Sequence, residues 1–212
     1  ASVAADPRQV AKTVAAVSPE DTLVTLASAP SLIGGGDLMA VGDLNWEIAG
    51  TGDFNGDGDI DVLWRNAVSG ANVVWYLNGT EWAGSAGLLT VSDLSWKIVG
   101  TGDFDKDGSV DILWRNSASG ANVVWYMNNA EWTGSADVLA VTDPSWQIAG
   151  TGDFDKDGVV DILWRNSVGG WNVVWYMDGT TWKGSADLIT VPVPAWQIVG
   201  TGDYNNDGNV DI

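Results

Sequence analysis

Short apolar runs alternate with polar, glycine-rich segments from Trp46 to the C-terminus. In residues 96–145 the apolar runs are WKIVGTG (96–102), VDILWRN (110–116), NVVWYMN (122–128) and DVLAV (137–141). Their short length and their content of valine, isoleucine and tryptophan favour strands over helices. The segments between them are rich in glycine, serine, asparagine and aspartate, which are residues typical of turns. The pattern therefore predicts four strands in this stretch.

The same four-strand unit recurs with a period of 50 residues. Trp46, Trp96, Trp146 and Trp196 mark the period, and each opens a W-x-I-[AV]-G-T-G-D-[FY] run. Four strands in a repeat of about 40–50 residues are typical of a β-propeller blade. Three further tryptophan families keep the period, and only Trp171 lies outside all four: Trp64, Trp114 and Trp164; Trp75, Trp125 and Trp175; Trp82, Trp132 and Trp182.

The repeats begin and end in the middle of a unit. Residues 22–45 align with the second half of a unit, through the runs TLVTLAS and DLMAV, and residues 196–212 align with a first half. We therefore predict an all-β propeller of about four blade-equivalents, with one blade split between the termini. Its parts are a half blade at 22–45, whole blades at 46–95, 96–145 and 146–195, and a half blade at 196–212. Residues 1–21 lie outside the repeat and are predicted to be a leader, either a short helix or a linker.

The split blade leaves two arrangements open. It can clasp a ring shut within one chain, or one chain can complete the next and so build oligomers or a filament. Unpaired strand edges at either end favour closure or assembly of some kind.

The composition removes several classes of function. The chain has no histidine and no cysteine, so the usual Ser-His, Cys-His and zinc constellations cannot be built. A formal charge of −19, from 9 basic and 28 acidic residues, opposes binding to nucleic acid and to anionic membranes. No apolar run is long enough for a membrane span. We expect a protein that is not an enzyme.

One acidic loop recurs between the first two strands of each unit, with the pattern D-x-[DN]-x-D-G-x-x-D. Calcium takes six to eight oxygen ligands at about 2.3–2.6 Å, and oxygens at positions 1, 3 and 5 can converge if the chain turns after them. Glycine at position 6 permits that turn, and the aspartate at position 9 can close the sphere. Position 7 varies in type, which suggests that its backbone carbonyl is the ligand there.

The four loops predict up to four calcium ions. They contain 15 of the 28 acidic residues of the chain, so much of the negative charge lies in the predicted cation sites. The predicted ligands are Asp53, Asn55, Asp57, Asp59 and Asp61; Asp103, Asp105, Asp107, Ser109 and Asp111; Asp153, Asp155, Asp157, Val159 and Asp161; and Asp203, Asn205, Asp207, Asn209 and Asp211.

An EF-hand does not fit these loops. It needs a bidentate glutamate at position 12 and helices on both sides, whereas position 12 here is Trp64, Trp114 or Trp164 and the flanks are predicted strands. With strands on both sides and aspartate at position 9, the loops resemble those of the FG-GAP/VCBS repeat family, found in integrin-α-type and lectin-type propellers. The resemblance covers residues 46–212 and, more weakly, 22–45. It implies a propeller with a calcium ion in each loop, usually on an extracellular protein.

Two further sets of residues recur. Trp82, Trp132 and Trp182 follow turn residues and are the best candidates for exposed rings that stack on a sugar, although folding back over the blade edge is the simpler interpretation. Arg65, Arg115 and Arg165 end the second strand of each unit; we expect them to pair with an aspartate of the neighbouring blade, or else to bind a ligand. The other strand tryptophans are expected to pack between blades.

Together these features predict a secreted, extracellular calcium-binding module that binds glycans or another surface macromolecule, such as an extracellular protein. Two alternatives stay open. One is a structural subunit that self-assembles through the split blade, and the other is an accessory repeat domain of a larger secreted enzyme.

Overall fold

The protein is described by a computed structural model over residues 35–193 and 195–212. Contacts divide the chain into residues 1–37 and 38–212, and all of the described strands belong to the second unit. The predicted leader and the run TLVTLAS lie outside the described residues. No helix in the described part is long and apolar enough to cross a membrane.

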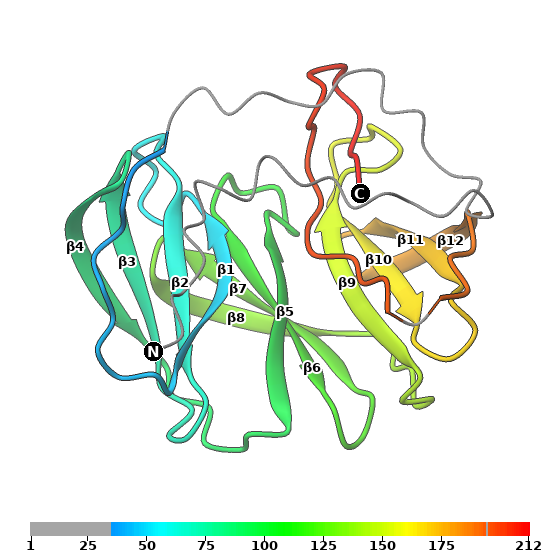
Figure 1. The fold of residues 1–212 in the computed structure, drawn as a ribbon, viewed down its shortest axis with the longest axis horizontal. Coiled ribbons are helices and arrows are strands. Elements are labelled where there is room, and N and C mark those ends of the chain that lie inside the picture. The colour runs from blue at the N-terminus through cyan, green and yellow to red at the C-terminus, as the bar shows by residue number, and fades with distance from the viewer. Residues whose placement is uncertain (1–34, 194) are drawn as a thin grey trace, which may run out of the picture. The chain divides into compact units, whose positions relative to one another are not determined.

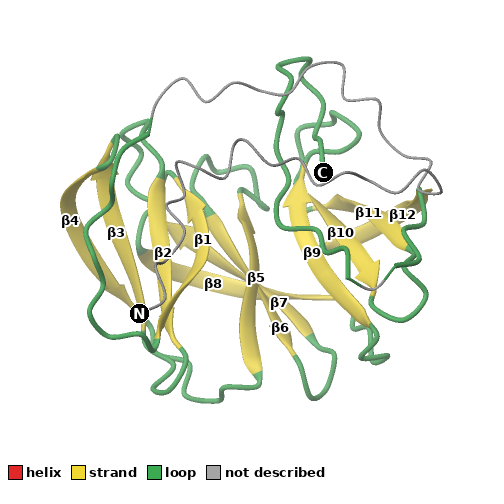
Figure 2. Cartoon of the chain, viewed as in Figure 1, coloured by secondary structure: helices red, strands yellow, loops and turns green. Residues whose placement is uncertain are grey.

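In the described residues, twelve strands form three four-stranded antiparallel sheets, and each sheet keeps its strands in chain order (Figure 1). Figure 2 shows only strands and loops in the described residues. The strands are β1 (Trp46–Gly52), β2 (Asp61–Asn66), β3 (Asn72–Asn78) and β4 (Glu81–Leu88); β5 (Trp96–Gly102), β6 (Asp111–Asn116), β7 (Asn122–Asn128) and β8 (Glu131–Val138); and β9 (Trp146–Gly152), β10 (Asp161–Asn166), β11 (Asn172–Asp178) and β12 (Thr181–Leu188). The all-β class and the 50-residue period are confirmed.

The fourth strand of each unit starts earlier than the apolar pattern predicts. In the second unit it is β8, Glu131–Val138, and not 137–141. Asn128 pairs with Glu131, so only two residues connect β7 to β8, and Asn129 turns the chain with a φ of 55°. Strand pairing therefore resumes directly after the turn, and Trp132 lies inside the strand. The second strand begins one residue later than predicted, at Asp111.

The predicted half blades differ from whole ones. Residues 37–41 form no strand; the residues equivalent to β8 would be 31–38, of which 31–34 lie outside the description. Residues 196–212 form a single bridge, between Gly202 and Asp211. They still follow the pattern of the preceding units, because the Thr201 hydroxyl donates to the Thr151 carbonyl at 2.7 Å.

The sheets of adjacent units pack through large apolar side chains. Trp114 and Trp164 are 2% and 1% exposed; Trp114 belongs to a core with residues of the first sheet, and Trp164 belongs to a core with residues of the second. Within its own sheet, each ring centre also lies 4.9 Å from that of the tryptophan on the next strand, Trp125 or Trp175. The predicted packing role of these tryptophans is confirmed. The central strand β6 is buried along its whole length, which agrees with a sheet covered on both faces.

The three sheets do not close into a ring within residues 35–193 and 195–212. A propeller is therefore suggested by the four-stranded units and by their sequential packing of β1 against β5 and β5 against β9. The closed ring and the number of blades remain predictions.

Candidate metal centre in the repeated acidic loops

The first three acidic loops are tight turns between the first two strands of a sheet, and the fourth lies within the Gly202–Asp211 bridge. Two residues of each loop have positive φ, namely those at positions 4 and 6: Gly56 and Gly58, Lys106 and Gly108, Lys156 and Gly158, and Asn206 and Gly208. The sequence predicted this need at position 6 only. The two left-handed residues fold the loop back on itself, so that its side chains converge.

The aspartate at position 1 fixes the loop from inside. The Oδ1 atom of Asp53 accepts the N–H of Gly56 at 2.7 Å, and its Oδ2 accepts the N–H of Gly58 at 2.9 Å. The position-6 contact recurs in the other three loops at 2.8–2.9 Å. The N–H of Gly58 makes the largest contribution to lowering the pKa of Asp53 below its usual value. This carboxylate is thus held ionised and turned inward.

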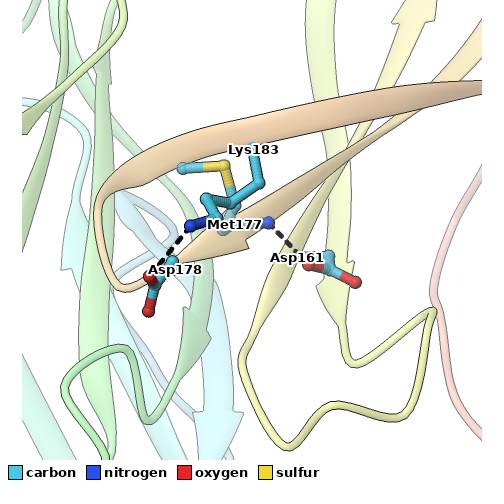
Figure 3. A network of polar contacts seen from close by, with 4 residues as sticks. All are labelled: Asp161, Met177, Asp178 and Lys183. Carbon is cyan, nitrogen blue, oxygen red and sulfur yellow. Dashed lines mark hydrogen bonds and ion pairs between the residues drawn. The ribbon is translucent and has the colours of Figure 1, made fainter.

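The aspartate at position 9 is fully buried in the three complete repeats, as Asp61, Asp111 and Asp161. Asp111 Oδ2 accepts the N–H of Phe104 and Oδ1 accepts the N–H of Met127, both at 2.9 Å. Figure 3 shows the equivalent bond in the third repeat, from Met177 to Asp161. Each of these carboxylates therefore ties the loop to the third strand of its sheet.

Burial makes the charge at position 9 costly. Desolvation raises the pKa of Asp111 and of Asp161 to about 6, although backbone hydrogen bonds act in the opposite direction and neighbouring loop carboxylates add a smaller increase. The pKa of Asp61 is also raised, mainly by desolvation. A cation beside these groups would reverse the effect, because an opposite charge favours the ionised form.

Carboxylates at positions 1, 3 and 9 meet in two of the loops. One oxygen from each of Asp103, Asp105 and Asp111 lies within 4.8 Å of the others, and the same holds for Asp153, Asp155 and Asp161. The first and fourth loops carry Asn55 and Asn205 at position 3, which offer an amide oxygen. The donor sets contain hard oxygen atoms alone, and such sets suit calcium, magnesium or manganese. These clusters could hold a metal ion.

Positions 5 and 7 are arranged differently. The carboxylates of Asp57, Asp107, Asp157 and Asp207 accept the N–H of the position-7 residue at 2.7–2.9 Å and are not members of the two convergent sets. At position 7, the side chain of Val159 has no ligand atom and is 3% exposed in the core, so the predicted ligand there is its backbone carbonyl. A ligand role for Asp59, Ser109, Asn209 or the position-7 carbonyls stays a prediction.

The predicted glycan-stacking tryptophans are exposed, with Trp82, Trp132 and Trp182 at 50%, 47% and 46%. Two of them pack by an edge on a tryptophan of the neighbouring strand, since Trp132 lies 6.5 Å from Trp125 and Trp182 lies 6.4 Å from Trp175. One part of each ring is thus supported, and the rest faces solvent.

The predicted pairing of the arginines with aspartates is wrong. Arg115 donates to the carbonyls of Gly120, Val141 and Trp146 and to the side chain of Asn122, at 2.8–3.2 Å. Its guanidinium also lies 4.9 Å from the centre of the Trp164 ring. The carbonyls of three segments converge at the end of the second strand and replace the carboxylate. Arg65 and Arg165 make similar contacts.

The fold and the loops together define an all-β repeat protein with one acidic loop in each repeat. A family model described as an FG-GAP-like repeat matches residues 53–114, 103–164 and 153–212. The chain belongs to the FG-GAP-like repeat family.

No curated protein matches the chain. Among solved structures, the chain is similar to a Bacteroides caccae protein of unknown function at 11% identity and a TM-score of 0.43. The match covers 77% of this chain and 52% of that protein, so this chain spans about half of its length.

Proposed function

We propose that the acidic loops bind calcium and that the chain is a non-catalytic, calcium-stabilised repeat module of the propeller type. The observation that carries this proposal is the convergence of Asp103, Asp105 and Asp111, repeated 50 residues later by Asp153, Asp155 and Asp161. Three carboxylates this close repel one another unless a cation lies between them.

Calcium fits better than magnesium. Magnesium demands near-ideal octahedral geometry and keeps several waters, whereas calcium accepts irregular sets with several carboxylates and carbonyls. The residues of one loop, including Asp103 and Asp111, offer such a set from a single short segment. Four ions of charge +2 would reduce the net charge of −19 to −11. We therefore expect folding and calcium binding to be linked.

The test is thermal unfolding of the chain over a calcium titration that starts from excess chelator. With dissociation constants of about 10⁻⁴–10⁻³ M, as in extracellular modules, 10 mM calcium stabilises the fold by about 1.4–2.7 kcal/mol per site. The double variant Asp105→Ala and Asp155→Ala removes the oxygen ligand at position 3 of two loops and should lose much of this increase, while Asp137→Ala, on the exposed face of β8, should keep it. A melting temperature that a chelator leaves unchanged would refute calcium binding.

A second proposed function is glycan binding on an extracellular protein. The half-exposed rings of Trp82, Trp132 and Trp182 favour it, because they recur once in each sheet and each presents an apolar face to solvent. The test is a glycan array with these three residues changed to alanine, and with Trp196→Ala as a control for an exposed tryptophan elsewhere. Equal binding by parent and triple variant would remove them from the site.

Self-assembly is a further proposal, favoured by exposed apolar side chains in the first sheet and in residues 196–212. Ile48 is 58% exposed and Val199 is 97% exposed, whereas the residues equivalent to Ile48, which are Ile98 and Ile148, pack against the two cores. Light scattering with and without calcium tests it. A monomer under both conditions would exclude assembly through these faces.

A further inference from the structure

Several departures from the repeat meet at one place between the second and third sheets. The position that is Glu47 in the first repeat is Lys97 in the second. Pro144 replaces the leucine of the two earlier repeats, and Trp171 replaces their alanine. Lys97 and Pro144 line one cavity of about 240 Å³, together with Arg115, Trp146 and Ile148. The ring of Trp171 stacks on that of Trp146, with centroids 6.4 Å apart and planes at 28°.

The cavity has an unbalanced positive charge. Lys97 and Arg115 are direct cross-strand partners on β5 and β6, and like charges in such a pair destabilise a sheet. Neither side chain has a carboxylate within salt-bridge distance in the part of the chain that the structure describes, where Lys183 pairs with Asp178. In the first and third repeats the cross-strand partner of the equivalent arginine is not a cation: it is Glu47 in the first and Gln147 in the third.

The two cations play different parts. Both terminal nitrogens of Arg115 already donate to protein oxygens, and the side chain is 8% exposed. It therefore supplies charge and few free donors. Lys97 is exposed and makes no hydrogen bond through its ammonium group among the described residues, so its three N–H donors are open to a ligand.

Apart from Ser117 and Gln147, the other residues that line the cavity are apolar and suit a ring. Trp146 lines the cavity, and its indole stacks on that of Trp171; Ile148 and Pro144 continue the apolar lining. A volume of 240 Å³ is below the usual range for drug-sized ligands, about 300–1,000 Å³, which favours a single ring. A ligand for this cavity thus needs an apolar face and an anionic group.

We propose that this cavity binds a carboxylated sugar ring, with its carboxylate on Lys97 and its C–H face against Trp146. The inference rests on the proposed glycan-binding function and deepens it, because it adds a site other than the rings of Trp82, Trp132 and Trp182 and gives the class of sugar. The whole chain is acidic, but the charges next to this cavity are positive and therefore attract an acid. Salt screens the more distant negative charges, because the screening length is about 8 Å at physiological ionic strength.

The experiment compares methyl glucuronide with methyl glucoside, which differ at the carboxylate. Both are titrated into the full chain at physiological salt with calcium present, and binding is followed through the indole N–H signals of the protein by NMR. The glucuronide should shift the signals of Trp146 and Trp171, and the glucoside should bind about tenfold more weakly, because a hydrogen bond between charged groups is lost.

Lys97→Gln introduces the residue that the third repeat has at this position and should lower the affinity for the glucuronide about tenfold. Lys183→Gln removes one positive charge far along the sequence, at an exposed ion pair, and should leave the affinity unchanged. Trp171→Ala introduces the residue that the first two repeats have at this position and should lower the affinity for both sugars. An equal loss in the Lys97 and Lys183 variants would overturn the inference, because it would indicate a general charge effect.

Two other results would overturn the inference. One is binding of benzoate without the glucuronide, which would assign the cavity to aromatic acids. The other is equal binding of the two sugars with no effect of Lys97→Gln. Neither result touches the calcium proposal, which melting experiments test, nor binding through Trp82, Trp132 and Trp182, which the array tests.

Discussion

Asp111 and Asp161, whose pKa values rise to about 6, predict that stability depends on pH with opposite sign in the presence and absence of calcium. The pKa of Asp111 and of Asp161 is about 6 in the folded chain, against an ordinary value of 3.8. Without an ion the folded state therefore binds more protons than the unfolded state near pH 5. Stability must then fall as the pH rises through 6.

The size of the effect follows from the same values. Between pH 5 and pH 7 each group loses about 1 kcal/mol of stability, and the pair loses about 2 kcal/mol. For a domain of this size that corresponds to a fall of about 4–8 °C in melting temperature. Asp53 and Asp207, whose pKa values are lowered by backbone hydrogen bonds, stay ionised in both states over this window and do not oppose the trend.

The assay is thermal unfolding at pH 5, 6 and 7, in chelator and in 10 mM calcium. In calcium the melting temperature should rise with pH, because the ion binds the deprotonated carboxylates. The double variant Asp111→Asn and Asp161→Asn should lose most of the pH dependence in chelator, and the raised pKa values of Asp61 and Asp105 leave a smaller dependence of the same sign. The reasoning is refuted if the parent chain shows the same slope in both solutions.

Three further predictions concern the loops and the contacts between sheets. In calcium, Asp111→Asn should lower the free energy of unfolding by about 2–4 kcal/mol, because a buried N–H loses its charged acceptor and the ion loses a ligand. Urea unfolding should show a smaller decrease in chelator. The exposed control Asp137→Asn should change the free energy of unfolding by less than about 0.5 kcal/mol. Gly100→Ala should cost about 1–3 kcal/mol, since its Cβ would lie 2.5 Å from Thr151 Cγ2, whereas a Cβ at Gly87 meets nothing within 4 Å. An unchanged urea midpoint for Gly100→Ala would show that the sheets can separate there. Lys106→Gly should raise the free energy of unfolding by about 1 kcal/mol, because it removes a left-handed lysine with φ of 64°; a lower midpoint in chelator would contradict this.

The period, the strand-rich class and the first three strands of each unit could be predicted because large apolar side chains mark them. The fourth strand could not, because β8 is mostly exposed and carries Gly134, Ser135 and Ala136 at its centre. An edge strand of small and polar residues has no apolar pattern to reveal it. Its position depends instead on the two-residue turn at Asn129, where asparagine takes a conformation more common for glycine.

The candidate site was predictable at positions 1, 3 and 9, where the same oxygen-bearing side chains recur in register. The left-handed turn at position 4 was not, because Lys106 and Lys156 hold it in two loops and lysine gives no such signal. The partners of Arg115 were missed for a related reason. Its acceptors are mainly backbone carbonyls, which every residue has, so no residue type identifies them.

The position-9 aspartate explains why an ion in an exposed loop would stabilise the whole sheet. Asp111 accepts the N–H of Phe104 in the loop and the N–H of Met127 in the third strand, and the side chains of both donors are 1% exposed. Met127 packs in the core between the first two sheets, and Phe104 packs in the core between the second and third. A carboxylate that we propose as a metal ligand therefore connects one loop to both cores. Without the ion, the Asp111 carboxylate would be less fully ionised and would be a weaker acceptor for the two buried N–H groups. We therefore expect calcium to stabilise the packing between repeats as well as the loop that binds it.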